Sequence, residues 1–274
     1  MRAHRTTLAA ALSLVAVVLC SCATLNRISE QAFLISPQQE ATLGQQLAVE
    51  IQKEYPVYEA DANATAYLQK LGVELVYSSP PCEQTFEFHW VDSDQVNAFA
   101  IPGGHCYVNL GLLREAENEA ELAAVVAHEI GHVTERHGAK ALSRSRFYGL
   151  LGSLALGEDP DALAQLAVDI VGSGILLKHS RDAELEADEV SIRTLNRAGI
   201  NPNGMVWFLQ KLNKDGQSRV FEYFSTHPLT ENRVEIGNSI VRDLGSPDPH
   251  WRVDSPEFQA LKKRYPKKAE GDAG

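Results

Sequence analysis

The segment from Glu119 to Gly138 constrains the fold of this chain most strongly, because it combines a buried helical stripe with the spacing of metal ligands. It reads EAELAAVVAHEIGHVTERHG, preceded by Asn118 as a suitable N-cap and ending on Gly138 as a suitable stop. Its larger apolar residues recur at steps of three and four: Leu122, Val125, Val126, Ile130 and Val133. This periodicity predicts a helix with one face in a hydrophobic core.

Three residues of this helix have the types and spacing of a zinc hydrolase. His128 and His132 are four residues apart and therefore share a helix face, where two imidazoles can bind one metal ion. Two neutral imidazoles and one carboxylate leave a fourth position for water, whose pKa falls towards neutrality. Glu129 could take the proton from that water as it attacks a peptide carbonyl. Because the same pattern also arises by chance, a third ligand is needed to support a metal site.

A second helical stretch supplies a candidate third ligand. Residues 180–192 read SRDAELEADEVSI, and Glu184 and Asp188 within them are four apart on one helix face. Glu184 could complete the zinc site, while Asp188 could accept a hydrogen bond from the far nitrogen of a ligand histidine and fix its tautomer. An acidic helix can also be only a solvated charged face. The combination with the two histidines favours the metal site.

Four motifs resemble, in this order, those of the HtpX-like and type I CAAX prenyl protease family of zinc metallopeptidases. They are residues 98–113 (AFAIPGGHCYVNLGLL), the histidine-containing helix, residues 180–188 and residues 224–233 (FSTHPLTENR). The resemblance implies an α+β, mostly helical gluzincin domain. It also implies a small antiparallel or mixed β-sheet beside the zinc helix.

The resemblance further implies a function. His128, His132 and Glu184 would hold one Zn²⁺ ion per chain, with Glu129 as the general base. The family's periplasmic lipoprotein branch is the most similar, although no helical repeat domain is expected after the peptidase domain. A zinc metalloendopeptidase of the bacterial cell envelope would cut misfolded or stalled envelope proteins in quality control. The alternative is a chaperone or assembly factor for outer-membrane proteins, with a zinc site capped by its own chain.

The first residues are typical of a bacterial lipoprotein signal. Basic residues precede an apolar run from Leu8 to Leu19 that is too short to span a bilayer. Cleavage after residue 21 is expected to leave Cys22 as the lipidated N-terminus, whereas Cys20, preceded by leucine, is the poorer site. An ordinary secretory peptide is the alternative. We expect an outer-membrane lipoprotein facing the periplasm, with residues 22–36 as its tether.

The chain is acidic and long enough for one substantial core. It has 25 Lys and Arg against 36 Asp and Glu, a formal net charge of −11. Loss of residues 1–21 would remove Arg2 and Arg5 but no acidic residue, so the mature chain would be more acidic still. Nucleic acid is therefore not an expected partner. We expect one metallopeptidase domain over residues 37–245 and a C-terminal tail over 246–274, with a solvated basic cluster in it.

Three strands are predicted after two N-terminal helices, which span residues 37–55 and 61–76. The strands are residues 85–91, 96–101 and 105–110. A substrate backbone can add to the edge strand of a sheet, and 105–110 is the candidate, with His105, Tyr107 and Asn109 along it. An ordinary sheet strand is the alternative.

Cys82 and Cys106 would be the only cysteines besides Cys22 in the mature chain, in a compartment that oxidises thiols. Antiparallel pairing of the first and third predicted strands could bring their Cα atoms within bridging range. A disulfide between them is therefore predicted.

The later part of the chain offers two more candidate site residues. His227 precedes Pro228 in a predicted loop and could be a fourth zinc ligand in a resting state or stabilise the oxyanion in an active one. Arg233 could also stabilise the oxyanion. Before them lie stretches rich in alanine, leucine and glycine at 139–157 and 161–177, which charged residues interrupt, so that their uninterrupted apolar runs are too short to span a membrane. They are predicted to be core or lid helices, with contact between 147–156 and a membrane or hydrophobic partner as the alternative.

Overall fold

Helix α5 (Glu119–Thr134) runs through the centre of the fold, and every residue from Glu119 to Val133 is buried. Its N-cap is Asn118, whose side chain accepts a hydrogen bond from the backbone N–H of Glu121 at 3.0 Å. A computed structural model of the chain describes residues 35–145, 160–174, 176, 178–215, 223, 225–228 and 232–267, all within the unit Ile35–Gly274. The predicted signal peptide, Cys22, most of the tether and residues 147–156 lie outside the described residues.

The predicted end of this helix at Gly138 is wrong. The helix ends at Thr134, because Arg136 adopts a left-handed conformation with φ of 55° and turns the chain into α6 (His137–Arg144). A residue with a Cβ atom rarely adopts this conformation. Two contacts of the Arg136 side chain hold it there. The Arg136 guanidinium donates to buried Glu40 at 2.7 Å and to the carbonyl of Ile35 at 2.9 Å.

A three-stranded mixed sheet lies beside α5. Its strands are β1 (Glu87–Val91), β2 (Ala98–Ile101) and β3 (His105–Asn109), in the order β1-β3-β2. β3 pairs in parallel with β1 and antiparallel with β2. The strand predicted as the substrate edge, 105–110, is therefore the central strand, and its backbone is paired on both sides.

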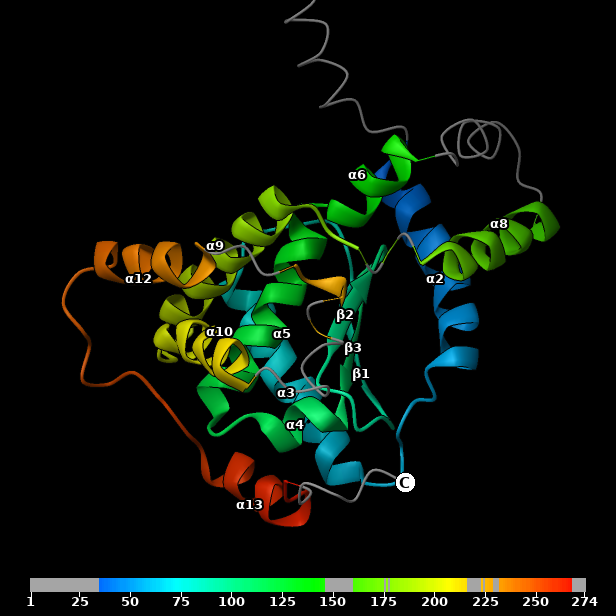
Figure 1. Cartoon of the computed structure of the whole chain (residues 1–274). Helices are drawn as coiled ribbons and strands as arrows, with labels where there is room; N and C mark the ends of the chain where they lie inside the picture. The colour runs from blue at the N-terminus through cyan, green and yellow to red at the C-terminus, as the bar shows by residue number, and fades with distance from the viewer. Residues whose placement is uncertain are drawn as a thin grey trace, which may run out of the picture. The chain divides into compact units, whose positions relative to one another are not determined.

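The two faces of the sheet are covered by different helices (Figure 1). Phe88, Trp90 and Cys106 point into the main core with α3 (Ala62–Ser78) and α5. The opposite face carries Tyr107 and Phe99, whose stacked rings lie beside α2 (Pro37–Glu54). Helix α8 (Pro160–Ser173) packs on α2. The sheet thus separates two packing environments, and only one of them contains α5.

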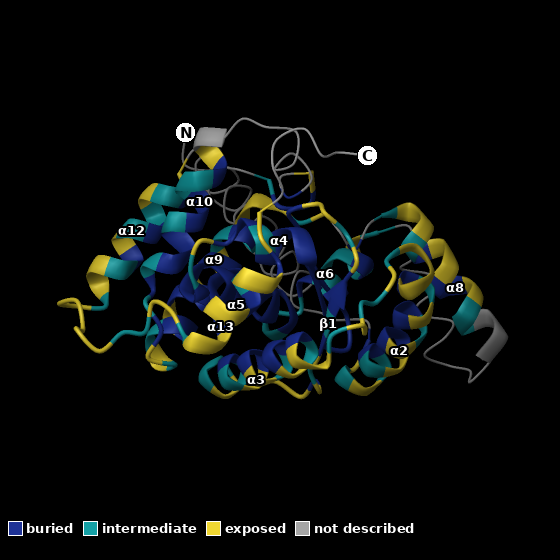
Figure 2. Ribbon diagram, turned by 90° about the horizontal axis from the view of Figure 1, so that it is seen from below, coloured by how far each residue is buried: buried dark blue, intermediate teal, exposed yellow. Residues whose placement is uncertain are grey.

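Five further helices complete the described fold. They are α4 (Leu110–Glu115), α9 (Arg181–Arg197), α10 (Asn203–Asp215), α12 (Arg233–Asp243) and α13 (Pro256–Arg264). Of these, α9 and α10 contact α5 directly, and α12 contacts both of them. Figure 2 shows buried α5 and β1 between outer helices with exposed faces. The predicted α+β, mostly helical domain with a mixed sheet is confirmed.

The predicted C-terminal tail is packed up to residue 267. Phe258 and Leu261 of α13 are buried in the core against α3. Three of the basic residues predicted to be solvated have partners: Lys262 donates to the carbonyl oxygens of Leu113 and Arg114 at 3.2 and 2.7 Å, Arg264 pairs with Asp61, and Lys267 pairs with Glu115. Cations at the C-terminal end of α4 are favourable because its last carbonyls carry partial negative charge.

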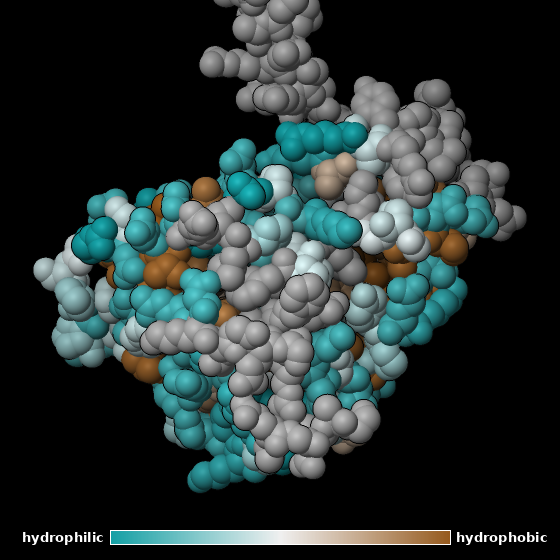
Figure 3. All heavy atoms as spheres, viewed as in Figure 1, coloured by the Kyte–Doolittle hydropathy of each residue, from teal (hydrophilic) through white to brown (hydrophobic). Residues whose placement is uncertain are grey.

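On the face shown in Figure 3, the described surface is mostly hydrophilic, and hydrophobic groups form small separate patches on it. Among the residues that the structure describes, no helix is both long and apolar enough to cross a membrane.

Replacing Gly44 by alanine should destabilise the fold by about 1–3 kcal/mol. A Cβ atom at Gly44 of α2 would lie 2.2 Å from the carbonyl oxygen of Pro102 in the β2–β3 turn, and the backbone there cannot easily move. Gly172→Ala in α8 is the matched control, because nothing lies within 4 Å of its Cβ position, and helix propensity should make that change neutral or stabilising. Urea unfolding of both variants measures the difference, and equal stabilities would contradict the close packing of α2 on the turn.

Candidate metal centre

Three side chains from α5 and α9 converge in the core. The Nε2 atoms of His128 and His132 lie 3.0 Å apart. A carboxylate oxygen of Glu184 lies 3.5 Å from the first nitrogen and the other oxygen 3.4 Å from the second. The helices can approach this closely because residue 131 is glycine, and a Cβ there would lie 3.2 Å from the Cα of Ala187. The structure thus brings together the three predicted ligands, all of them buried.

His227 supplies a fourth donor atom. Its Nδ1 lies 3.3 Å from His128 Nε2 and 3.2 Å from Glu184 Oε1, and the four residues form a cluster able to hold a metal ion. Ligand atoms at about 2.1 Å from a tetrahedral ion are about 3.4 Å from one another. The donor separations in this cluster, 3.0–3.5 Å, therefore fit a four-coordinate divalent ion.

Asp188 lies behind the cluster, where it can orient a ligand. His128 Nδ1 is 3.0 Å from Asp188 Oδ1. Arg233 in turn donates to both oxygens of Asp188 at 2.7 and 2.8 Å, and its Nη1 is 2.9 Å from Glu184 Oε2. Because two carboxylates engage this fully buried guanidinium, the predicted role of Arg233 at an oxyanion is not supported. Its guanidinium instead bridges the carboxylates of Asp188 and Glu184.

Two histidines near the centre were missed in the sequence. His132 Nδ1 lies 2.8 Å from His137 Nδ1, and His137 Nε2 lies 3.0 Å from Glu186. The ring of His179 stacks on that of His132 with centroids 3.7 Å apart. His137 lies beyond the end of α5, so the helical spacing that identified the ligands could not place it. Only the left-handed turn at Arg136 brings it back to the site.

Glu129 is placed to handle a proton. It is fully buried, and neither carboxylate oxygen has a hydrogen-bond partner among the described residues. Burial raises the pKa of this carboxyl above its ordinary value, while nearby His227 and His128 act in the opposite direction. Glu129 Oε1 lies 3.5 Å from His227 Nε2, which is beyond a good hydrogen bond, and a buried carboxylate without a hydrogen bond is costly. A water bound to a metal ion that His128, His132 and Glu184 hold would provide the missing donor.

The other carboxylates favour a cation in the cluster. Burial alone would raise the pKa of Glu184, but the imidazoles of His227, His128 and His132 hold it well below its usual range. Burial would lower the pKa of His128, yet Asp188 and Glu184 raise it to about 9. The negative potential that produces this rise also attracts a divalent ion.

The strand nearest this cluster is β2. His227 Nε2 lies 3.3 Å from the carbonyl oxygen of Ala98, and the hydroxyl of Thr226 lies 3.4 Å from Asn97 Oδ1. Within the described part of the chain, β2 pairs in the sheet only with β3. The segment 225–228 therefore lies against the start of the unpaired edge of β2.

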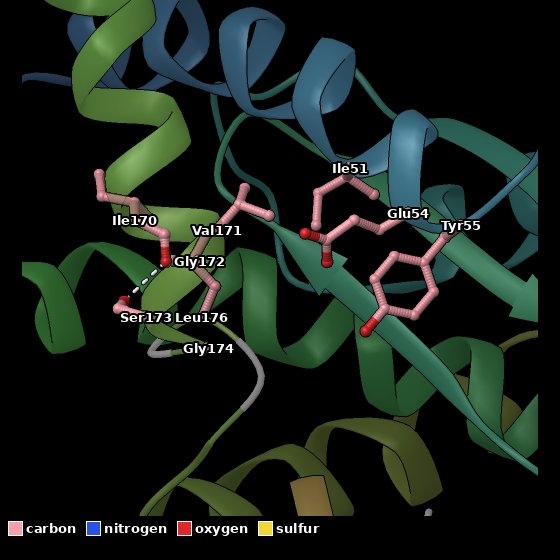
Figure 4. Close-up of a pocket in the computed structure, with 9 residues that line it drawn as sticks. All are labelled: Ile51, Glu54, Tyr55, Ile170, Val171, Gly172, Ser173, Gly174 and Leu176. Atoms are coloured by element: carbon pink, nitrogen blue, oxygen red, sulfur yellow. Dashed lines mark hydrogen bonds between the residues drawn. The ribbon is translucent and has the colours of Figure 1, made fainter.

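A pocket of about 270 Å³ lies between α2 and α8 (Figure 4). Ile51 of α2 and Tyr55, the residue after this helix, face Ile170 and Val171 of α8 across it. The ring of Tyr55 contacts that of Phe99 on β2 edge-on, with centroids 4.9 Å apart. None of the residues of the metal cluster lines this pocket, and its link to β2 is the contact between Tyr55 and Phe99.

The predicted disulfide is not formed. Cys82 is an exposed free thiol and Cys106 a buried one. The prediction assumed antiparallel pairing, but β1 runs parallel to β3 with Phe88 opposite Cys106.

Comparison with known proteins relates this site to peptidases. Residues 62–239 match the model of peptidase family M48. The beta-barrel assembly-enhancing protease of Yersinia pestis is 34% identical over 242 residues, which cover 84% of this chain and 49% of that protein. The protein of the same name from Escherichia coli (strain K12) is 34% identical over 211 residues, covering 73% of this chain and 43% of that protein.

A eukaryotic relative is more distant. The mitochondrial metalloendopeptidase OMA1 of Schizosaccharomyces pombe is 30% identical over 172 residues, which cover 62% of this chain and 51% of that protein. The chain spans about half the length of the curated relatives it matches.

Proposed function

The chain belongs to peptidase family M48, and we propose that it is a zinc-dependent endopeptidase of the bacterial cell envelope. One observation carries the proposal: His128, His132 and Glu184 converge with donor atoms 3.0–3.5 Å apart while the carboxylate of Glu129 lies beside them without a hydrogen-bond partner among the described residues. Imidazole and carboxylate donors in this number are typical of catalytic zinc.

His128, His132 and Glu184 would hold the zinc ion, which would supply Lewis acidity towards a peptide carbonyl and a water molecule. Glu129 then acts as the general base: one of its oxygens takes a proton from the attacking water and passes it to the leaving nitrogen. Asp188 and Arg233 hold His128 and Glu184 in position throughout.

The substrate backbone would bind along β2. An extended peptide can add to an unpaired strand edge through main-chain hydrogen bonds, and β2 is the strand that contacts both α5 and the His227 segment. The carbonyl of Ala98 is one of its acceptors. Recognition through the backbone predicts broad sequence tolerance, and the pocket beside Tyr55 would take a side chain of the bound peptide.

Removal and return of zinc test the proposal. Purified protein should contain one catalytic zinc ion that disappears in His128→Ala, and it should cleave an unfolded protein such as reduced casein. Cleavage should stop after treatment with a zinc chelator and return with added Zn²⁺. Full cleavage by protein without detectable zinc would refute a zinc peptidase.

The buried state of the site points to regulation by the chain itself. His227 completes the donor set with Nδ1 and contacts β2 with Nε2. It therefore competes both with water for the metal and with a substrate for the strand. This arrangement also suits the alternative function, a chaperone or assembly factor with a capped zinc site.

His227→Ala is expected to increase cleavage of unfolded substrates. If the resting site is open about a tenth of the time, the increase can reach about ten-fold. Initial rates with and without the substitution measure it, with the exposed His250→Ala as the matched control. A fall in kcat of about ten- to a thousand-fold would instead assign His227 to the oxyanion.

The substrates and location follow from the named relatives. Two of them are beta-barrel assembly-enhancing proteases, so we infer that unfolded or misassembled outer-membrane proteins are the substrates. A lipid on Cys22 would hold the enzyme at the outer membrane, facing the periplasm.

Cys22→Ala should abolish labelling with a radioactive fatty acid and move the protein from the membrane to the soluble fraction. Cys20→Ala is the control and should leave both unchanged. If Cys20→Ala releases the protein instead, cleavage occurs at the earlier cysteine.

A further inference from the structure

A second group of metal-ligand residues lies on the opposite face of the sheet from α5. Glu87 and His89 are on β1 and His105 is the first residue of β3. Their donor atoms all lie within 4.8 Å of one another. Because side chains alternate along a strand and Cys106 points into the core with α5, His105 points to the other side. The sheet therefore separates this group from the first metal centre.

The strand register holds the three side chains together. Glu87 is directly opposite His105, and His89 lies one pleat further along the same face. Gly104 permits this register, because a Cβ atom there would lie 2.3 Å from the carbonyl oxygen of Thr85, just before β1. The rings of His89 and His105 are nearly parallel, with an interplanar angle of 18°, and that of His89 also stacks on Tyr107. The donors are thus placed by rigid elements.

The donor geometry resembles that of the first centre. Glu87 Oε2 lies 3.3 Å from His105 Nδ1 and 3.6 Å from His89 Nε2. Both distances are close to the edge of about 3.4 Å expected between two ligands of a tetrahedral zinc ion. They also match the separations of 3.4 and 3.5 Å between Glu184 and its histidines.

The two imidazole nitrogens face the carboxylate of Glu87. His89 Nε2 and His105 Nδ1 are both buried, and apart from these contacts with Glu87 Oε2 neither has a hydrogen-bond partner among the residues that the structure describes. The side chain of Glu87 is 56% exposed, so an ion can reach the group from solvent.

From these observations we infer that Glu87, His89 and His105 form a second divalent metal site, suited to Zn²⁺. Two imidazoles and a carboxylate prefer zinc to magnesium or calcium, and water would complete the coordination. An ion here would join the starts of β1 and β3. It would thereby stiffen the sheet that carries β2 without contacting the residues of the first centre.

Metal counting separates the two sites. Untagged protein dialysed against a small excess of Zn²⁺ should contain two zinc ions per chain by mass spectrometry. His89→Gln/His105→Gln should contain one, His128→Ala should also contain one, and the surface control His250→Ala should contain two. If only the first site fails to bind zinc, the wild type should contain one zinc ion per chain, and this ion should be lost when His89 and His105 are replaced.

Thermal unfolding provides a second readout. With the first site filled, further zinc should raise the melting temperature of the wild type by several degrees and leave that of the double variant unchanged. If the double variant does not fold, Glu87→Gln replaces it, because its side chain is largely exposed, and zinc affinity should fall at least about ten-fold. One zinc per chain in the wild type that is lost in His128→Ala but retained in the double variant, or two in the folded double variant, would overturn the inference.

Discussion

Glu129→Gln is expected to lower kcat for peptide hydrolysis by about 10²–10⁴-fold while leaving the zinc content unchanged. Glutamine keeps the size of the side chain but cannot accept a proton at neutral pH. The ligands remain, since Glu129 lies beside the donor set and the metal would be held by His128, His132 and Glu184. Initial cleavage rates and metal analysis on the same preparation measure the two effects separately.

Glu135→Gln is the matched control for that change. Glu135 follows the last turn of α5 and is partly exposed, so its substitution should leave kcat within about two-fold of wild type. Near-normal activity in zinc-loaded Glu129→Gln would refute the general-base role, and loss of zinc from this variant would show that Glu129 contributes to binding.

Arg233→Met is expected to destabilise the fold by about 3–5 kcal/mol. Arg233 is fully buried and engages Asp188 and Glu184. Methionine fills similar space but leaves both carboxylates without their cation in a region of low polarity. The pKa of Asp188, which burial alone would raise, is held below its usual value by Arg233 and His128. Loss of the guanidinium removes this stabilisation of the charged form.

Urea unfolding at saturating zinc measures this effect, and Arg193→Met is the control. Arg193 pairs with Glu189 one turn away on the same α9, but both side chains are nearly half exposed. Such a pair contributes about 0.5 kcal/mol or less. Equal unfolding free energies for the two variants would mean that the buried carboxylates find other partners.

The sequence was sufficient for the elements whose signals are local. The capping box at Ser36 and the N-caps at Asp61, Asn118 and Ser180 start four helices at or within one residue of the predicted positions, because a cap and an apolar period act over a few residues. The four ordered motifs also predicted a zinc metallopeptidase relationship, which the match to peptidase family M48 confirms at the level of the family.

The predictions that failed all depended on contacts between distant segments. Strand order decides which strand has a free edge, and a stretch of alternating residues reads the same at the centre of a sheet as at its edge. The parallel pairing of β1 with β3 replaced the antiparallel pairing on which the disulfide between Cys82 and Cys106 depended. Likewise, the sequence of α13 is typical of a charged tail, and only its packing against α3 buries Phe258.

The sequence by itself thus determined the helix of His128, Glu129 and His132 and the acidic helix of Glu184, since both follow from spacing within one helix. Only the tertiary structure decided what surrounds them. It placed Arg233 against Asp188, turned the chain at Arg136 so that His137 meets His132, and brought Glu87 beside His105. The physical reason is that ligand spacing is set by the 3.6-residue helical period, whereas these contacts depend on how separate elements pack.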